Sequence, residues 1–409
     1  MTALDRALDS ASGPAPVAGY WVSGGPQRVL DAAVLPDAGF VEAHMTITGW
    51  PGYAPTPLVD LAGWADCLGI GRLRYKDEGE RFGLGSFKAL GGAYAVERLV
   101  REARRCGAAL PTVCCATDGN HGRAVAWGAQ LAGCACTIFV HAGVSAARVA
   151  AIEAYAAYVV RVEGNYDDAV RRADESARGN GWTVVSDTSY EGYRDLPLQV
   201  MQGYRVLAQE CVDALPAETP THVFLQTGVG GFAAAMAVHF DRCWAARPPR
   251  FVLVEPERAD CLLRSLQAGV SRTVIGELDT VMAGLACGEP SLVAWEILAV
   301  LAAAAVSIPD AAALRTMRAL AGTVAYTAPP GSMTERNPSY QFDRPIVAGE
   351  SGAAGLAGLV AVCADPGLRE ALALDATSSV LVIGTEADTD AGLYRRVVGV
   401  DAESIRDRR

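Results

Sequence analysis

The sequence predicts an α/β fold built on mainly parallel β-sheets. After about residue 70, short apolar runs alternate with longer segments whose apolar residues recur at helical spacing. The short runs are almost continuously hydrophobic, which is typical of parallel strands covered by helices on both faces. A chain of 409 residues with 51% hydrophobic residues is long and apolar enough for two or three domains.

Each expected strand is a short apolar run bounded by turn-forming residues. The strands are expected at 72–77, 111–117, 136–140, 157–162, 183–187, 222–226, 251–255 and 380–386. Between them, apolar residues three and four apart predict amphipathic helices. The helices are expected at 87–104, 120–131, 145–156, 165–179, 193–214 and 231–246. Residues 324–345 are rich in Pro, Ser, Thr and Asn and predict a long loop or lid.

Composition excludes several classes of function. The net charge of −11 argues against a nucleic-acid surface, which requires a basic patch. The longest apolar run, 297–306, is too short to cross a bilayer. The eleven cysteines contain no CxxC and the five histidines no HExxH, so no metal site is expected. Scattered cysteines with apolar neighbours predict reduced thiols in a cytoplasmic protein.

Lysine is almost absent from the chain. Of 35 basic residues only Lys76 and Lys88 are lysines, and the others are arginines. Arginine can replace lysine as a surface charge, but a guanidinium does not deprotonate and cannot act as an amine nucleophile. Composition therefore selects Lys88, in "RFGLGSFKALGGAY", and Lys76 as functional candidates.

Polar residues follow the expected strands at the edge where parallel sheets bind ligands. Thr117, Asp118, Gly119, Asn120 and His121 follow one strand and open a helix, whose first N–H groups and positive dipole end suit a carboxylate. Each of these residues is also explained by an ordinary helix cap or turn. The same applies to Asp187, which ends the strand at 183–187.

Two further strand ends carry a glycine loop and a hydroxyl. Residues 227–235, "TGVGGFAAA", form a glycine turn between a strand and a helix and suit a phosphate. The turn also fits GxGxxA with Glu255 ending the next strand, so a nicotinamide-dependent dehydrogenase is an alternative. Thr385 follows the last strand, where its hydroxyl could bond a ring nitrogen. An amine, a carboxylate cradle, a phosphate cradle and a hydroxyl together predict a pyridoxal phosphate site.

Several segments resemble fold-type-II pyridoxal phosphate enzymes, the group of the serine/threonine dehydratases and the tryptophan synthase β chain. "SFKALGGA" is similar to their Schiff-base lysine motif and "TDGNHG" to their SxGNHG loop. "YEGYRDLPLQVMQGY", "VEPERADCLLRS", "TVMAGLACGEPSLVAWEIL", "GESGAAGL" and "GTEADTD" resemble, in the same order, the diaminopropionate ammonia-lyase branch. The resemblance spans roughly residues 40–400.

The resemblance implies a role for each motif residue. Lys88 would form the Schiff base, and Asp118 and Asp187 would act on the two enantiomers of the substrate. The substrate would be bound by the loop of Thr117, Asp118, Gly119, Asn120 and His121. The cofactor, pyridoxal 5'-phosphate, would contact Phe87, Lys88, Asn120, Gly228, Val229, Gly230, Gly231, Phe232 and Thr385.

The resemblance also implies an architecture and a reaction. It predicts two three-layer αβα domains with the cofactor in the cleft between them: a large discontinuous domain of residues 1–95 and 207–409, and a small mobile domain of 96–206. The expected reaction is elimination of ammonia from D- or L-2,3-diaminopropionate, a step of amino-acid catabolism, by a homodimer. A serine/threonine dehydratase-like enzyme, or a β-replacement enzyme acting on another β-substituted amino acid, is the alternative.

Overall fold

The chain folds as two compact units. The computed structural model describes residues 3–9, 15–25, 29–117, 119–324 and 343–408. The first unit comprises Met1–Asp31, Thr56–Gly79 and Gln209–Arg409, and the second comprises Ala32–Pro55 and Glu80–Ala208. The domain division predicted from the sequence, at residues 95/96 and 206/207, stays a prediction.

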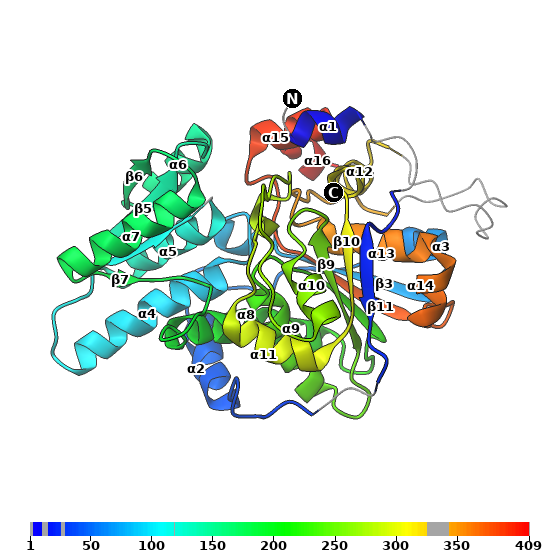
Figure 1. Cartoon of the computed structure of the whole chain (residues 1–409), viewed down its shortest axis with the longest axis horizontal. Coiled ribbons are helices and arrows are strands. Elements are labelled where there is room, and N and C mark those ends of the chain that lie inside the picture. Colours follow the sequence, from blue (N-terminus) through cyan, green and yellow to red (C-terminus); the bar gives the residue numbers. More distant parts are fainter. Residues whose placement is uncertain (1–2, 10–14, 26–28, 118, 325–342, 409) are drawn as a thin grey trace. The chain divides into compact units, whose positions relative to one another are not determined.

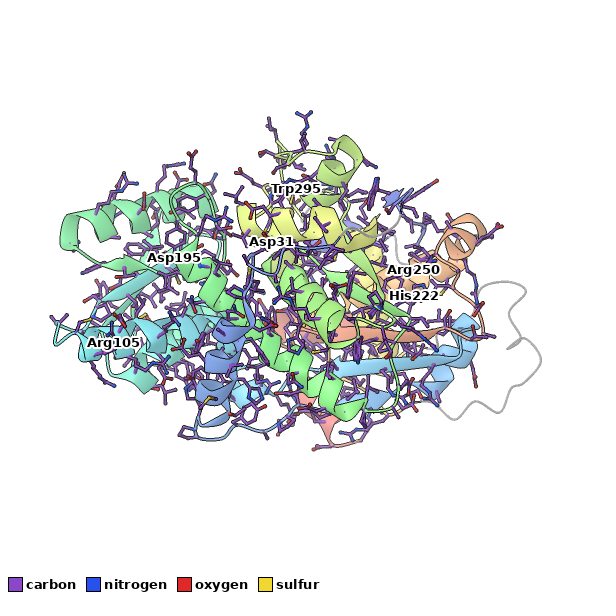
Figure 2. The ribbon with its side chains drawn as sticks, turned by 90° about the horizontal axis from the view of Figure 1, so that it is seen from below. Asp31, Arg105, Asp195, His222, Arg250 and Trp295 are labelled. Carbon is purple, nitrogen blue, oxygen red and sulfur yellow. The ribbon has the colours of Figure 1, made fainter. Side chains whose placement is uncertain are left out.

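A seven-stranded sheet organises the first unit, in the order β1-β10-β9-β8-β11-β3-β2. The five central strands are parallel, and the edge strands β1 and β2 are antiparallel to their neighbours. The strands are β1 (Gly19–Val22), β2 (Leu58–Asp60), β3 (Arg72–Asp77), β8 (His222–Gln226), β9 (Arg250–Pro256), β10 (Ala302–Ile308) and β11 (Ser379–Gly384). Figure 2 shows His222 and Arg250 near one another, at the first residues of neighbouring strands.

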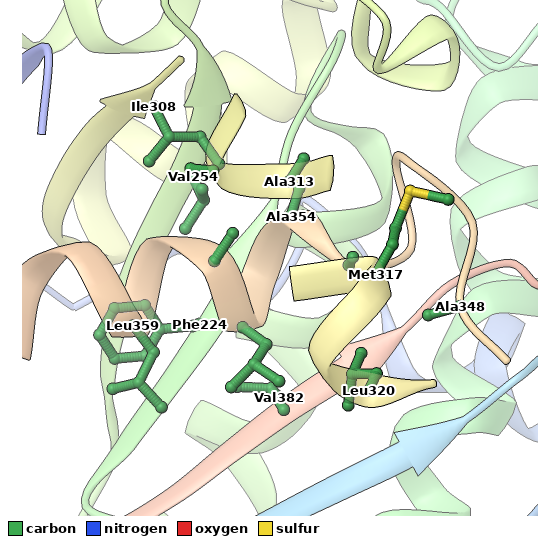
Figure 3. Close-up of a cluster of buried hydrophobic side chains, with 14 of the residues drawn as sticks. Phe224, Val254, Ile308, Ala313, Met317, Leu320, Ala348, Ala354, Leu359 and Val382 are labelled. Carbon is green, nitrogen blue, oxygen red and sulfur yellow. The ribbon is translucent and has the colours of Figure 1, made fainter. Parts of the chain in front are cut away.

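The helices of the first unit pack on this sheet or on one another. They are α1 (Ala3–Asp9), α3 (Ala62–Leu68), α9 (Gly231–Cys243), α10 (Cys261–Ala268), α11 (Leu292–Leu301), α12 (Asp310–Leu320), α13 (Ala354–Ala364), α14 (Pro366–Ala371), α15 (Ala391–Val398) and α16 (Ala402–Arg406). Helix α13 lies across β8, β9, β10 and β11 (Figure 1). It approaches the sheet closely because Gly358 has no side chain. A Cβ at this position would lie only 2.5 Å from Val254. Figure 3 shows the resulting core, in which Phe224, Val254 and Val382 of the strands meet Leu359 of α13 and Met317 of α12.

The second unit contains a four-stranded, fully parallel sheet in the order β6-β5-β4-β7. Its strands are β4 (Val113–Ala116), β5 (Cys136–His141), β6 (Tyr158–Val162) and β7 (Thr183–Val184). Its helices are α2 (Asp37–Thr48), α4 (Ala89–Arg105), α5 (Asn120–Ala132), α6 (Ala146–Glu153), α7 (Tyr166–Asn180) and most of α8 (Asp195–Ala214). Helices α4 and α5 pack at close range because Gly128 has no side chain. A Cβ there would lie 2.5 Å from the backbone of Ala93.

The mainly parallel α/β fold predicted from the alternating pattern is confirmed. The sequence pattern did not indicate β1, β2 or β10. The strand expected at 183–187 ends at Val184, and the N–H of Val185 still donates to the carbonyl of Cys114 on β4 at 2.8 Å. Residues 325–342 of the expected loop lie outside the described residues. Within the described part of the chain, no helix has both the length and the hydrophobicity needed to cross a bilayer.

Candidate active site

Lys88 is the residue immediately before α4 and serves as its N-cap. Its ammonium donates a hydrogen bond to Oδ2 of Asp187 at 2.5 Å, and both side chains are about one-fifth exposed, at 20% and 21%. Burial raises the pKa of Asp187, but the charge of Lys88, the nearby His121 and the hydrogen bond from Lys88 outweigh it. Together they hold the pKa well below its usual range. Asp187 is therefore a carboxylate at neutral pH.

Two aromatic rings surround the amine of Lys88. Its Nζ lies 5.4 Å from the centre of the Phe87 ring and 5.8 Å from that of Tyr204. The two rings lie 4.7 Å apart. Tyr204 can approach α4 because Gly91 has no side chain. A Cβ there would lie 2.5 Å from the Tyr204 ring.

Tyr193 fixes the loop that carries Asp187. Its hydroxyl donates to the carbonyl of Val184 at 2.8 Å and accepts from the N–H of Ser186 at 3.0 Å. One side chain therefore satisfies two backbone groups that do not bond to β4. Burial raises the pKa of Tyr193, so its phenol stays neutral. Asp187 is thus held on a short, tied loop beside the end of a strand.

The loop after β4 is folded around Thr117. Its hydroxyl accepts hydrogen bonds from the N–H groups of Gly119 at 3.0 Å and Gly122 at 3.1 Å. Asn120 is the first residue of α5, so the loop leads directly into a helix N-terminus. The predicted catalytic residue Asp118 lies outside the described residues. His121 points back from α5, with Nε2 2.8 Å from the carbonyl oxygen of Val185 and Nδ1 3.9 Å from Oδ2 of Asp187.

In the first unit, the glycine loop between β8 and α9 forms a narrow turn. Gly230 has a φ of +93°, a conformation that residues with a side chain rarely adopt. A Cβ on Gly228 would lie 2.9 Å from Sγ of Cys287 and 3.2 Å from Cα of Leu285. The "AGLACGEP" segment therefore packs directly against the loop. The first N–H groups of α9 have no acceptor within the helix, and this turn presents them to an anion.

Thr385 follows β11, which is the parallel neighbour of β8. Nε2 of Gln226, the last residue of β8, donates to Oγ1 of Thr385 at 2.9 Å and to the carbonyl of Ile383 at 2.8 Å. A carbonyl only accepts, so the amide nitrogen must face both oxygens. The hydroxyl hydrogen of Thr385 is thus available for an acceptor elsewhere, such as the unprotonated nitrogen of a pyridine ring.

Comparison with known proteins identifies the family and its cofactor. The pyridoxal-phosphate dependent enzyme family matches residues 50–386. The diaminopropionate ammonia-lyase of Escherichia coli K12 is 41% identical over 365 residues, which cover 85% of this chain and 88% of the relative. The chain belongs to the diaminopropionate ammonia-lyase family. The Salmonella typhimurium diaminopropionate ammonia-lyase is 38% identical over 374 residues, covering 85% of this chain and 89% of the relative.

Structures of the ammonia-lyase family agree with this assignment. The holo E. coli diaminopropionate ammonia-lyase superimposes with a TM-score of 0.82 at 36% identity, covering 94% of this chain and 98% of the other. Other structures of that enzyme are complexes with an aminoacrylate-PLP azomethine reaction intermediate and with D-serine. The cofactor of the family is pyridoxal phosphate, so the nicotinamide alternative is excluded.

Each unit carries groups of the chemistry that this cofactor requires. Lys88 could supply an amine for the aldehyde, the loop at Gly228–Gly231 N–H donors for the phosphate, and Thr385 a hydroxyl for the ring. Within the second unit, the structure brings together Lys88, His121 and Asp187. Tyr204 and Gln226 were not among the residues predicted from the sequence. Gln226 has one local signal, because it is a polar residue that ends the apolar strand "HVFLQ".

Proposed function

We propose that this protein eliminates ammonia from 2,3-diaminopropionate and releases pyruvate. In the balanced reaction, one diaminopropionate and one water give one pyruvate and two molecules of ammonia. The observation that carries the proposal is the direct contact of Lys88 with Asp187, in a chain whose diaminopropionate ammonia-lyase relatives match it over 85% of its length.

Bound pyridoxal phosphate supplies an aldehyde that condenses with amines and a ring that accepts the electron pair left at Cα. Lys88 would hold the cofactor through its amine, and as a neutral amine it could act as a base. A neutral lysine can take a proton from Cα, whereas arginine could not. We assign phosphate binding to Gly228, Val229, Gly230, Gly231 and Phe232, ring contacts to Phe87, Asn120 and Thr385, and the substrate carboxylate to the loop of Thr117–His121.

The leaving group explains the carboxylates. A β-amino group leaves only as neutral ammonia, so it must be protonated when its bond to carbon breaks. A carboxylate near the β-ammonium keeps that proton in place and favours a diamino acid by charge pairing. We assign this role to Asp118 and Asp187, which together with Lys88 are also the bases for the α-protons of the two enantiomers. Asp187 suits it because it is held charged on a fixed loop.

We also propose that the protein is a cytoplasmic homodimer. Support for the compartment comes from the cysteines, none of which forms a disulfide within the described residues. In the reducing cytosol, cysteines normally remain unpaired. Sedimentation velocity of the purified chain tests the assembly, and a monomer at micromolar concentration would contradict it.

The function is tested by measuring pyruvate formation from a panel of amino acids. The wild-type protein, loaded with cofactor, should convert D- and L-diaminopropionate at least about tenfold faster than serine or threonine, because the charge pairing acts only on the diamino acid. Lys88→Arg is the matched control, since it keeps a cation beside Asp187 but cannot form a Schiff base. It should lose the visible absorbance and the activity. Faster turnover of serine, or pyruvate formation only with an added nucleophile, would indicate a dehydratase or a β-replacement enzyme.

A further inference from the structure

One carboxylate oxygen faces two basic groups in the second unit. Oδ2 of Asp187 accepts from Lys88 Nζ at 2.5 Å and lies 3.9 Å from Nδ1 of His121. The imidazole and the amine thus share the same oxygen. From the sequence, His121 is expected only to be part of the substrate-binding loop, and the proposed mechanism makes no use of its side chain.

The hydrogen bonds fix the protonation of His121. Nε2 lies 2.8 Å from the carbonyl oxygen of Val185, which only accepts, so Nε2 carries a hydrogen. Nδ1 is buried and has no hydrogen-bond partner among the described residues. The side chain is only 10% exposed. Nδ1 therefore presents a buried lone pair toward the carboxylate of Asp187. Two acceptors face each other there, and a proton between them would allow a hydrogen bond.

That proton is present nearby, on Lys88. While Lys88 is an ammonium, Asp187 faces one cation and the neutral imidazole is tolerated. When Lys88 becomes a neutral amine, Asp187 loses this cation and remains a largely buried charge, which is unfavourable. We propose that His121 takes up the proton whenever Lys88 becomes neutral and returns it when Lys88 is protonated again, so that Asp187 always faces one cation.

The transfer balances in atoms and charge. The Nζ–H bond of Lys88 breaks as an O–H bond forms on Asp187, and that bond breaks as an N–H bond forms at Nδ1 of His121. The net charge of the three groups is zero before and after. Because 3.9 Å is longer than a hydrogen bond, the carboxylate or the ring must turn to bring the atoms to about 3 Å. His121 is a positioning residue here, since it acts on the reaction through Asp187 and Lys88.

The surrounding groups favour this exchange. Burial lowers the pKa of His121 and the charge of Lys88 lowers it further, whereas Asp187 raises it. Loss of the Lys88 charge therefore raises the basicity of His121 at the moment a proton becomes available. Cys115 on β4 and the phenols of Tyr193 and Tyr204 also interact with Asp187, but burial raises their pKa values and keeps them neutral. Asp118 lies outside the described residues.

A histidine-selective NMR titration of the full chain tests the coupling without substrate. In Lys88→Met, which has no charge at this position, the pKa of His121 should be about one unit or more above its wild-type value. Adding Asp187→Asn should remove the rise. His222, whose Nε2 also faces a backbone carbonyl, at 2.8 Å from Leu372, is an internal control and should not change. An unchanged His121 titration in Lys88→Met would overturn the proposal.

The pH dependence of the visible absorbance tests the same exchange in the cofactor-loaded enzyme. His121→Gln keeps an N–H donor for Val185 but takes up no proton. The pH at which half of the Schiff-base absorbance forms should rise by about one unit in this variant, and His222→Gln should keep the wild-type midpoint. A wild-type midpoint in His121→Gln would contradict proton uptake by His121 and leave this residue a purely structural role. The proposal rests on the proposed role of Lys88. Absence of pyruvate from diaminopropionate would refute the lyase function while leaving the NMR result valid.

Discussion

Replacing Lys76 by methionine should strongly destabilise the first unit. Lys76 lies on β3, and its Nζ donates to Oε2 of Glu210 at 2.6 Å and to the carbonyl of Thr56 at 2.7 Å. The two charged side chains are only 1% and 3% exposed. Oε2 of Glu210 also accepts from the N–H of Thr56 at 3.1 Å. Lys76→Met removes the ammonium that compensates a buried carboxylate.

The burial of this pair sets the magnitude. Removing one partner of a buried ion pair typically costs about 3–5 kcal/mol, because a charge is left in a poorly polarisable environment. Glu210→Gln in addition to Lys76→Met should recover most of this loss, since the amide removes the charge and keeps an acceptor for Thr56. Arg74 on the same strand is a matched control. It pairs at 2.6 Å with Asp60, which is 57% exposed, and Arg74→Met should cost less than about 1 kcal/mol.

Urea unfolding followed by tryptophan fluorescence measures these differences. The comparison includes the wild type, Lys76→Met, Glu210→Gln and the double variant. All four curves are fitted with one shared dependence of the unfolding free energy on urea concentration. A cost below about 1 kcal/mol for Lys76→Met, or losses in the double variant that simply add, would refute the argument. Additive losses would mean that the two charges contribute independently of each other.

Three further predictions concern the cofactor, the pH dependence and the substrate. Gly230→Ala should weaken cofactor binding at least about tenfold in an absorbance titration, since a Cβ is strained at φ +93°. Burial raises the pKa of Glu255 to about 8, so the folded protein keeps a proton that the unfolded chain has lost above about pH 4.5. Stability should therefore fall by about 1 kcal/mol or more from pH 5 to pH 8, and Glu255→Gln should flatten this slope in urea unfolding. Asp118→Asn and Asp187→Asn should each slow one enantiomer of diaminopropionate more than the other in a pyruvate assay, and equal losses would argue against two bases.

Local signals were sufficient to predict the central elements of the fold. Strands β3 and β8 occupy 72–77 and 222–226, as expected from their apolar runs and flanking turns. Strand β10 was missed because it continues directly from α11 within the apolar run 297–306. Neither hydrophobicity nor periodicity separates a buried strand from a buried helix there, and alanine favours the helix. The long-range pairing with β9 is what makes residues 302–308 a strand.

The candidate site, too, was predicted from the sequence only in part. Lys88 could be predicted from its rarity and its motif, and Asp187 from its place at a strand end. Their 2.5 Å contact joins residues 99 positions apart and could not be predicted from spacing. Glu210, the partner of Lys76, is 134 positions away in the sequence. The orientation of His121 toward Asp187 depends on the loop that Tyr193 holds, so it too required the tertiary structure.

The ratio of ammonia to pyruvate tests the central claim most directly. The cofactor-loaded wild-type protein is incubated with D- or L-2,3-diaminopropionate, and both products are measured over the same time course. Elimination of the β-amino group followed by hydrolysis releases two ammonia molecules for each pyruvate, and Lys88→Arg should release neither product. A ratio of one, or no pyruvate from either enantiomer by an enzyme that shows the Schiff-base absorbance, would contradict the account.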